Sequence, residues 1–323
     1  MVTAPSAPHA IAGAPIAAVW RGEICEGVHS GHVRVTDAAG EVVLARGCDI
    51  ELFPRSALKP FQALAALRAG AELTGPQLAI ACASHAGSPA HVECVDSILD
   101  SVGLDRGALQ NTADVPLDGA AAAALHARGG DKEPILQNCS GKHAAMLAAC
   151  VAAGWDTATY LQEDHPLQEL IAETLAELTG TRLGWSVDGC GAPTATTSLS
   201  GLARAVSALA LAPVGSLEHR IVTAMRTYPH LVSGDGRFDT LAMQHVPGLV
   251  IKGGAEGVLM GAFDDGASII TKVADGNHRA NTPAFVAALA ALGVHADLSW
   301  AREPVRGHGQ PVGYVKWIEE ERE

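Results

Sequence analysis

The sequence contains few aromatic residues and few charged residues. Phe, Trp and Tyr make up 4% of its 323 residues, and Asp, Glu, Lys and Arg make up 18%, whereas 48% of the residues are apolar. This composition is typical of a globular protein and excludes a disordered one. Because aromatic residues are scarce and Ala-rich runs are long, we expect a core of mainly aliphatic side chains.

The sequence also lacks basic segments. It has 22 Lys and Arg residues against 35 Asp and Glu residues, which gives a net charge of −13. No run of basic residues and no basic–aromatic stripe is available to contact phosphates, so nucleic acid is not expected as a partner. The acidity favours solubility and would weakly repel an anionic substrate unless a local cationic pocket offset it.

Membrane and export signals are missing as well. No stretch approaches the roughly 18 apolar residues of a spanning helix, and the Ala- and Pro-rich segment Met1–Ala18 lacks the basic and apolar regions of a signal peptide. The seven cysteines are odd in number and scattered, which fits a reducing compartment better than a disulfide framework. We therefore predict a cytoplasmic protein that does not bind membranes.

Strand patterns lie near both ends of the sequence, and helical patterns fill its middle. Residues 1–15 predict a disordered tail. Strands are predicted at Ile16–Arg21, His32–Asp37, Glu41–Arg46, Leu78–Cys82, Leu249–Lys252, Ala267–Val273 and Gly313–Trp317. Helices are predicted at Ser56–Arg68, Pro89–Val102, Ser140–Val151, His165–Leu178, Ser198–Leu211 and Pro283–Leu292. We therefore expect an α+β protein with one sheet built from both chain ends and a helical lobe, roughly residues 90–225, inserted between them.

The segment Arg55-Ser-Ala-Leu-Lys-Pro60 has the S-x-x-K spacing of serine hydrolases that use a lysine base. Pro60 is tolerated only in the first turn of a helix, so Ser56 lies at or next to the helix start. Residues three apart share a helix face, which lets Ser56 approach Lys59. A partly desolvated lysine can take the proton of a serine hydroxyl and make it nucleophilic. The alternative is a capping serine beside a solvated lysine.

Two later segments support the catalytic interpretation. Ser84 and His85 follow the buried strand predicted at Leu78–Cys82, and Lys252-Gly-Gly254 lies at the end of a late strand, like the K-[ST]-G strand of the same hydrolases. Two lysines that converge on one pocket would lower each other's pKa by repulsion between like charges. One of them would then be neutral and able to accept a proton.

Two cysteines occur in positions suited to chemistry. Cys139 and Lys142 share the face of a helix start, where a thiolate is favoured, and Cys190 lies in the tight loop Asp188-Gly-Cys-Gly-Ala-Pro193. Two thiolates and a nitrogen donor could bind zinc, although a lysine ligand must first lose its proton. Buried thiols without a metal are the alternative. The segment Gly234-Asp-Gly-Arg-Phe-Asp239 is either a loop of the site or a plain turn.

Taken together, these segments resemble the asparaginase II family, the type that includes the rhizobial inducible asparaginase. The matching segments occur in one order along almost the whole chain after residue 15. They are Arg55-Ser-Ala-Leu-Lys-Pro60, Cys82-Ala-Ser-His85, Asn138-Cys-Ser-Gly-Lys-His143, Asp164-His-Pro166, Asp188-Gly-Cys190, Gly234-Asp-Gly-Arg237, Lys252-Gly-Gly-Ala-Glu-Gly257 and Asp275-Gly-Asn277.

The resemblance implies a single catalytic domain over residues 16–323, with a fold like that of the serine β-lactamases and glutaminases, and a homodimer. It implies that L-asparagine is hydrolysed to L-aspartate and ammonia by two Ser–Lys tandems, Ser56 with Lys59 and Ser84 with Lys252. It also implies a zinc ion bound by Cys139, Lys142 and Cys190. By the same resemblance, Arg55, His143 and Asp188 surround or orient the substrate.

Three alternatives stay open. A β-lactamase relative shares the S-x-x-K segment, but it is normally exported and carries an S-D-N motif, which this chain lacks. A glutaminase is chemically closer, because one methylene is worth only about 1–3 kcal/mol of discrimination. A non-enzymatic zinc-binding protein would keep the metal ligands without turnover. The segment Arg306-Gly-His308 departs from the Arg-Asn element that many family members carry near the end of the chain.

Overall fold

The structure is a computed structural model that describes residues 11–319. Most of the expected N-terminal tail, residues 1–10, lies outside the described residues. Strand β1 (Ala14–Arg21) already includes Ala14 and Pro15, so the first strand begins two residues before the expected start of the domain.

Strands from both ends of the chain form one antiparallel sheet. Its eight strands are ordered β11-β12-β1-β2-β10-β9-β8, and β3 also pairs with β2. Beside β1 they are β2 (Ile24–Thr36), β3 (Val42–Arg46), β8 (Val250–Gly254), β9 (Val258–Ala262), β10 (Ser268–Val273), β11 (Glu303–Gly307) and β12 (Gln310–Trp317). The predicted sheet from both chain ends is confirmed.

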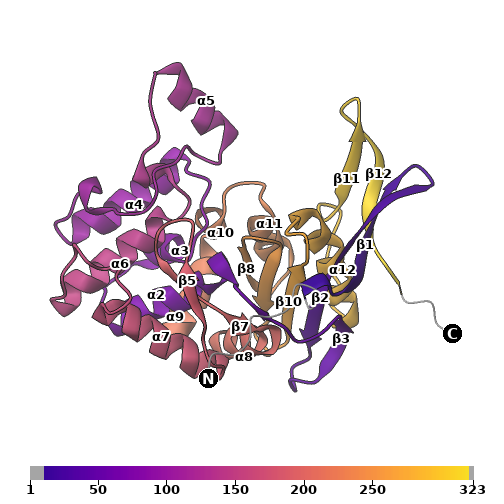
Figure 1. The fold of residues 1–323 in the computed structure, drawn as a ribbon, viewed down its shortest axis with the longest axis horizontal. Helices are drawn as coiled ribbons and strands as arrows, with labels where there is room; N and C mark the ends of the chain where they lie inside the picture. The colour runs from indigo at the N-terminus through magenta and orange to yellow at the C-terminus, as the bar shows by residue number, and fades with distance from the viewer. Residues whose placement is uncertain (1–10, 320–323) are drawn as a thin grey trace.

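A helical lobe is inserted between β4 (Glu51–Leu52) and β8, and it occupies the left half of the molecule in Figure 1. It starts earlier than predicted, because η1 (Arg55–Leu58) and α2 (Lys59–Arg68) already belong to it. The other helices are α3 (Gly75–Ala81), α4 (Pro89–Ser101), η2 (Arg106–Ala108), α5 (Gly119–Ala127), η3 (Pro134–Leu136), α6 (Ser140–Ala153), α7 (Pro166–Thr179), α8 (Leu199–Ala210), α9 (Leu217–Thr227), α10 (Pro229–Val232) and α11 (Phe238–His245).

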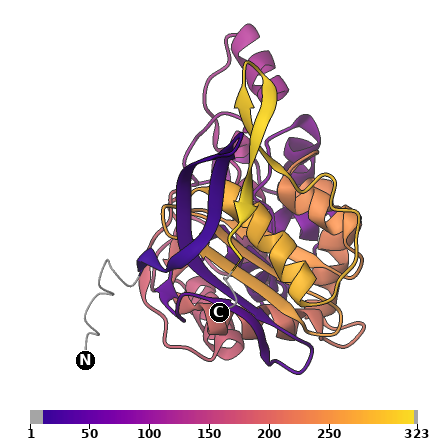
Figure 2. The same cartoon turned by 90° about the vertical axis from the view of Figure 1, so that its right-hand side faces the viewer.

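Helices also cover the sheet. Both α8 and α12 (Asn281–Ala291, preceded by η4, His278–Ala280) pack against β10, and every residue of β10 is buried. Since successive strand residues point to opposite faces, both faces of β10 are covered. Figure 2 shows α12 lying across the sheet. The short strands β5 (Trp185–Val187), β6 (Pro193–Ala195) and β7 (Thr197–Ser198) form small ribbons, β5 with β6 and β7 with β4.

The strand predicted at Leu78–Cys82 is wrong, because these residues end helix α3. The helix begins at a capping box in which Thr74 and Gln77 exchange hydrogen bonds between side chain and backbone, and Pro76 lies in its first turn. A buried apolar run of five residues has no periodicity that separates a strand from a helix. The capping box at Thr74 therefore favours a helix over a strand for these residues.

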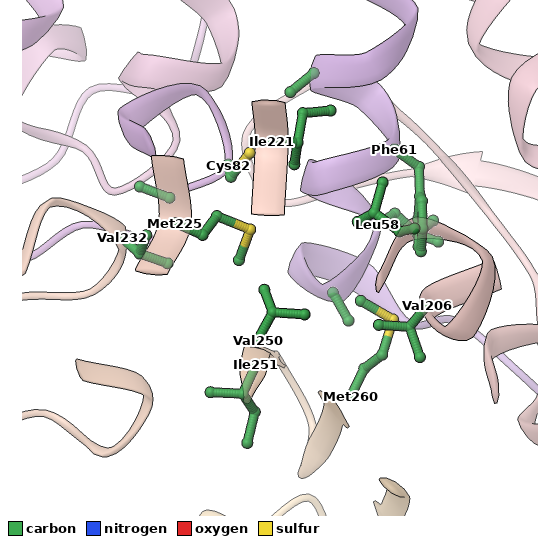
Figure 3. Close-up of a cluster of buried hydrophobic side chains, with 14 of the residues drawn as sticks. Leu58, Phe61, Cys82, Val206, Ile221, Met225, Val232, Val250, Ile251 and Met260 are labelled. Atoms are coloured by element: carbon green, nitrogen blue, oxygen red, sulfur yellow. The ribbon is translucent and has the colours of Figure 1, made fainter. Parts of the chain in front are cut away.

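The core is continuous between the lobe and the sheet (Figure 3). Leu58 and Phe61, from η1 and α2, lie near Val206 of α8 and Met260 of β9, and all four are buried. Burial of a side chain of this size stabilises the fold by about 1.5–3 kcal/mol. Leu58 and Phe61 therefore anchor the backbone on both sides of residue 59.

No helix within residues 11–319 has the length and apolarity that a membrane span requires. The cytoplasmic location stays a prediction.

Candidate active site

The predicted helix start at Ser56 is a short 3-10 turn that leads into α2. Pro60 lies in the first turn of α2, as its spacing predicted. Arg55 has a φ of 55°, a left-handed conformation that costs a residue with a side chain about 1–3 kcal/mol. Ser56 follows this strained residue and is half-buried, and within residues 11–319 its hydroxyl has no hydrogen-bond partner.

Arg55 is held in this conformation through its side chain. Its Nε donates to Asp188 Oδ1 at 2.7 Å, and its Nη2 lies 2.5 Å from the same oxygen. Burial would raise the pKa of Asp188, but Lys142 and Arg55 outweigh it and hold that pKa below its usual value. Asp188 therefore stays an anion and ties the turn before Ser56 to the loop that carries Cys190.

Lys59 is the central side chain of the arrangement. It is 1% exposed, and its Nζ lies 2.7 Å from Ala83 O, 3.4 Å from Asn138 O and 3.1 Å from Ser84 Oγ. Among the described residues, the hydroxyl that Lys59 contacts is thus that of Ser84 and not that of Ser56. The lysine connects the start of α2 with the segments that follow α3 and precede α6.

Ser84 is fixed by the backbone around it. Its N–H donates to Val232 O at 2.9 Å, and the N–H of His85 donates to Asn138 O at 3.2 Å. His85 Nδ1 accepts from Gly87 N–H, so its Nε2 donates to Ser140 Oγ at 2.8 Å. Burial lowers the pKa of His85, so this imidazole is neutral and structural.

Lys252, on the edge strand β8, is also 1% exposed. Its Nζ lies 3.6 Å from Asp239 Oδ2 and 2.5 Å from Gly253 O. Burial lowers the pKa of Lys252 to about 8, with a further lowering from Lys59 and an opposing effect from Asp239. Lys59 therefore acts on the pKa of Lys252, although the contacts of Lys252 are with Asp239 and Gly253 instead of Ser84.

The strand that carries Lys252 packs tightly on the turn that carries Ser56. A Cβ atom at Gly254 would lie 2.1 Å from Pro54 O and 3.2 Å from Ala57 N. Only a glycine allows the two backbones to approach this closely. The sheet edge and the start of the lobe therefore meet at the candidate nucleophile.

The two cysteines and the lysine of the predicted metal site come together. Lys142 Nζ lies 3.1 Å from Cys190 Sγ, Cys139 is hydrogen-bonded to Cys190, and all three side chains are buried. Cys190, together with Lys59 and Lys142, holds the pKa of Cys139 below its usual value against the effect of burial, and Cys139 Sγ also lies 3.1 Å from Asn138 Oδ1. Burial opposes the charged form of Lys142, but the sulfurs of Cys190 and Cys139 outweigh it and raise its pKa.

This donor set fits a thiophilic ion such as zinc. Two sulfurs and one amine converge in a buried site, where Zn²⁺ commonly takes three protein ligands and leaves one position open. The described part of the chain holds no group of three or more His, Cys, Asp and Glu side chains suited to a metal. The third protein ligand would therefore be Lys142, after loss of its proton on binding.

His143, the remaining predicted substrate residue, is fully buried beside Lys142. Its Nδ1 lies 2.8 Å from the Tyr160 hydroxyl, and its Nε2 has no partner within the described residues. Burial, together with Lys142 and Lys59, holds its pKa well below the usual value, so the ring is neutral.

Sequence reasoning missed two residues. Asp239 was predicted only as part of the segment Gly234–Asp239, which could be a loop of the site or a plain turn. Nothing in the sequence around Tyr160 distinguishes this residue from a core aromatic residue.

Comparison with known proteins gives a family match over nearly the whole chain. The family model described as L-asparaginase II matches residues 17–317. No curated protein matches the chain. Among solved structures, Mglu in its native form is 15% identical with a TM-score of 0.45, covering 80% of this chain and 59% of that one.

A second solved structure is that of EstCE1, described as a hydrolase with promiscuous acyltransferase activity. It is 12% identical with a TM-score of 0.41, covering 81% of this chain and 93% of that one. Of the two structures, Mglu is the longer relative to this chain, which spans about three fifths of the length of Mglu. At TM-scores below 0.5 these likenesses carry no argument about chemistry.

Proposed function

The chain belongs to the L-asparaginase II family, and from this membership we propose that it hydrolyses the side-chain amide of L-asparagine to L-aspartate and ammonia. Family membership supports an amidohydrolase, and the site supports a serine mechanism. One observation carries this mechanism. A buried lysine amine, Lys59 Nζ, lies within hydrogen-bonding distance of one serine hydroxyl and one helical turn beyond another serine, Ser56.

In the proposed reaction, Ser56 Oγ attacks the carboxamide carbon while Lys59 accepts the hydroxyl proton. The tetrahedral intermediate collapses, the C–N bond breaks, and the proton leaves with ammonia. Water then hydrolyses the Ser56 ester and releases aspartate. We expect backbone N–H groups near Ser56 to stabilise the developing oxyanion.

The partners of Lys59 suit a proton acceptor. A neutral lysine amine has two N–H groups and one lone pair. Ala83 O and Asn138 O can only accept, so they suit the two N–H groups, while the Ser84 hydroxyl can donate to the lone pair. In this role Ser84 relays a proton between the substrate side and Lys59, and Lys252 supports the relay.

Ser84 is the competing nucleophile, because its hydroxyl and not that of Ser56 lies 3.1 Å from Lys59 Nζ. The variants Ser56→Ala and Ser84→Ala separate the two roles through ammonia release and mass spectrometry of an acyl-enzyme. We expect Ser56→Ala to lose at least about 10³-fold in kcat and all acylation, and Ser84→Ala to retain slow acylation of Ser56. Acylation of Ser84 in the Ser56→Ala variant would reverse the assignment.

Substrate choice needs a direct comparison. We expect a higher kcat/KM for asparagine than for glutamine, with a difference limited to about 1–3 kcal/mol unless a buried polar group rejects the longer side chain. Nitrocefin serves as the β-lactam control, and no hydrolysis of it is expected. Bound metal without turnover of either amide would leave only the non-enzymatic alternative.

We propose that zinc binds to Cys139, Lys142 and Cys190. When bound, it would supply a fixed positive charge that shapes the pocket and orients the substrate. Arg55, Asp188 and His143 surround this cluster and are proposed to hold the amino acid part of the substrate. Metal analysis of the purified protein should find about one zinc per chain, and Cys139→Ser should lose it. A wild-type protein without metal would remove this proposal.

A homodimer is also proposed, on the family resemblance alone. Light scattering during size-exclusion chromatography tests it, and a mass near 33.1 kDa would contradict it.

A further inference from the structure

We propose that Asp239 is a positioning residue for Lys252, with a carboxylate from α11 that fills the space a side chain at residue 253 would occupy. This inference rests on the proposed function, because it assigns a role within the same site. It also explains why the Lys252-Gly-Gly254 strand carries glycine where related hydrolases carry Ser or Thr.

The first support is the geometry of the carboxylate. Asp239 lies in the first turn of α11 and is 7% exposed. Its Oδ2 accepts from the N–H of Gly253 at 2.8 Å and lies 3.6 Å from Lys252 Nζ. One carboxylate oxygen therefore binds both the backbone and the side chain of the edge strand, and this fixes where the amine can lie.

The second support is the space at Gly253. A Cβ atom there would lie 3.2 Å from Asp239 Oδ1 and 3.4 Å from Oδ2, which is tighter than ordinary packing. Gly253 is not among the residues with a positive φ, so its backbone does not require glycine. The reason for glycine is thus the neighbouring carboxylate. A Ser or Thr at this position would require the Asp239 carboxylate to move by a few tenths of an ångström.

The third support is the charge around Lys252. Asp239 from α11 and Cys139 before α6 favour its charged form, whereas Lys59 from α2 opposes it. His278 of η4 and Cys82 at the end of α3 also lie within its electrostatic reach. Burial opposes the charge most strongly and brings the pKa of Lys252 to about 8. Asp239 is the carboxylate that limits this fall.

The variant Asp239→Asn tests the role of the charge, because the amide keeps the shape and can still accept from Gly253 N–H. We expect the midpoint for deprotonation of Lys252 to fall by about one pH unit, the low end for an opposite charge within 4–6 Å. NMR of 13C-labelled lysine measures this midpoint in the full chain, with Lys252→Arg to assign the signal. This readout does not require turnover, so it stays informative if the protein does not hydrolyse asparagine.

The matched control is Asp235→Asn, the same chemical change at an exposed residue four positions earlier, in the loop that precedes α11. It should leave the Lys252 midpoint where it is. In an active enzyme, the pH dependence of kcat/KM should shift with the midpoint in Asp239→Asn and not in Asp235→Asn. A merely structural role of Asp239 would lower activity at all pH values without moving the profile.

Gly253→Ala is the second variant, and it decides the question if Asp239→Asn does not fold. It keeps every charge and presses a methyl group against the carboxylate, so the Lys252 midpoint should again fall. Adding Asp239→Asn to Gly253→Ala should then have little further effect, because both changes act on one contact. An unchanged Lys252 midpoint in a folded Asp239→Asn or Gly253→Ala protein would overturn the proposal.

Discussion

Lys59 and Lys252 lie on two sides of the candidate active site, one at the start of the helical lobe and the other on the edge of the sheet. Both are 1% exposed. Lys59 contacts two carbonyl oxygens and a serine hydroxyl and lies close to the Cys139 sulfur, whereas Lys252 faces the Asp239 carboxylate. Equal burial therefore accompanies two different sets of partners.

The difference shows that burial alone does not define a catalytic lysine. The serine hydroxyl beside Lys59 suits an amine that exchanges a proton, and the carboxylate near Lys252 suits an amine that is held in place. Lys142 adds a third case, in which two sulfurs raise the pKa of a buried amine. The following predictions test whether the lobe side and the sheet side of the site have these separate roles.

The largest effect is expected for Lys59→Met. Loss of the proposed base should lower kcat about 10³-fold, which corresponds to about 4 kcal/mol. The carbonyls of Ala83 and Asn138 would also lose a donor, at a cost of about 1–3 kcal/mol each if they stay dry. Ammonia release and urea unfolding measure the two effects. Lys132→Met, at a lysine whose side chain is 61% exposed, is the control and should change neither.

Gly254→Ala should disturb the junction between the two sides. Its methyl group would lie 2.1 Å from Pro54 O, so β8 and the Ser56 turn must separate. We expect the free energy of unfolding to fall by about 3 kcal/mol, as for other overpacked sites. Gly27→Ala, on strand β2 with nothing within 4 Å of the added atom, is the matched control. Equal urea midpoints for the two variants would refute the tight junction.

A smaller effect is expected from pH on the sheet side. The pKa of Lys252 lies near 8, below the ordinary lysine value, so the neutral amine predominates above this pH. If the neutral form supports the relay, kcat/KM should rise about tenfold between pH 7 and pH 9. Lys252→Met should remove this rise. A wild-type profile that is flat over the range would exclude a role for Lys252 titration.

The smallest effect is expected for Arg106→Ala, at a surface residue away from both the lobe side and the sheet side of the candidate active site. Arg106 binds Asp96 through two hydrogen bonds of 2.8 and 2.6 Å, but its side chain is half exposed. Water and salt screen such pairs, so Arg106→Ala should change the free energy of unfolding by less than about 1 kcal/mol and leave kcat unchanged. A larger loss of activity would show that the site extends toward α4.

Much of the fold could be predicted because the local sequence patterns favour the same strands and helices that the tertiary structure contains. The alternating strands at both ends and the helix start fixed by Pro60 are found close to their predicted positions. The run at Leu78–Cys82 failed because burial on all sides removes the periodicity that separates a strand from a helix.

The sequence predicted most of the residues that come together in the candidate active site. It predicted the contacts between them less well. Spacing placed Ser56 and Lys59 on one turn, but it carries no information on which hydroxyl the lysine reaches across the fold. Ser84 lies 25 residues from Lys59 in sequence, and backbone bonds to Val232 and Asn138 bring it there. Asp239 was missed because its role depends on Gly253, and no local pattern connects the two.

The pairing of β1 with β12, which matches Ala17 with Trp317, has a consequence for synthesis. Strand β1 can pair with β2 early, but its second partner, β12, is synthesised some three hundred residues later. Until then β1 and β2 expose an unpaired edge, a surface prone to association with other chains. Early packing of the helices against these strands would shorten the time for which this edge is exposed.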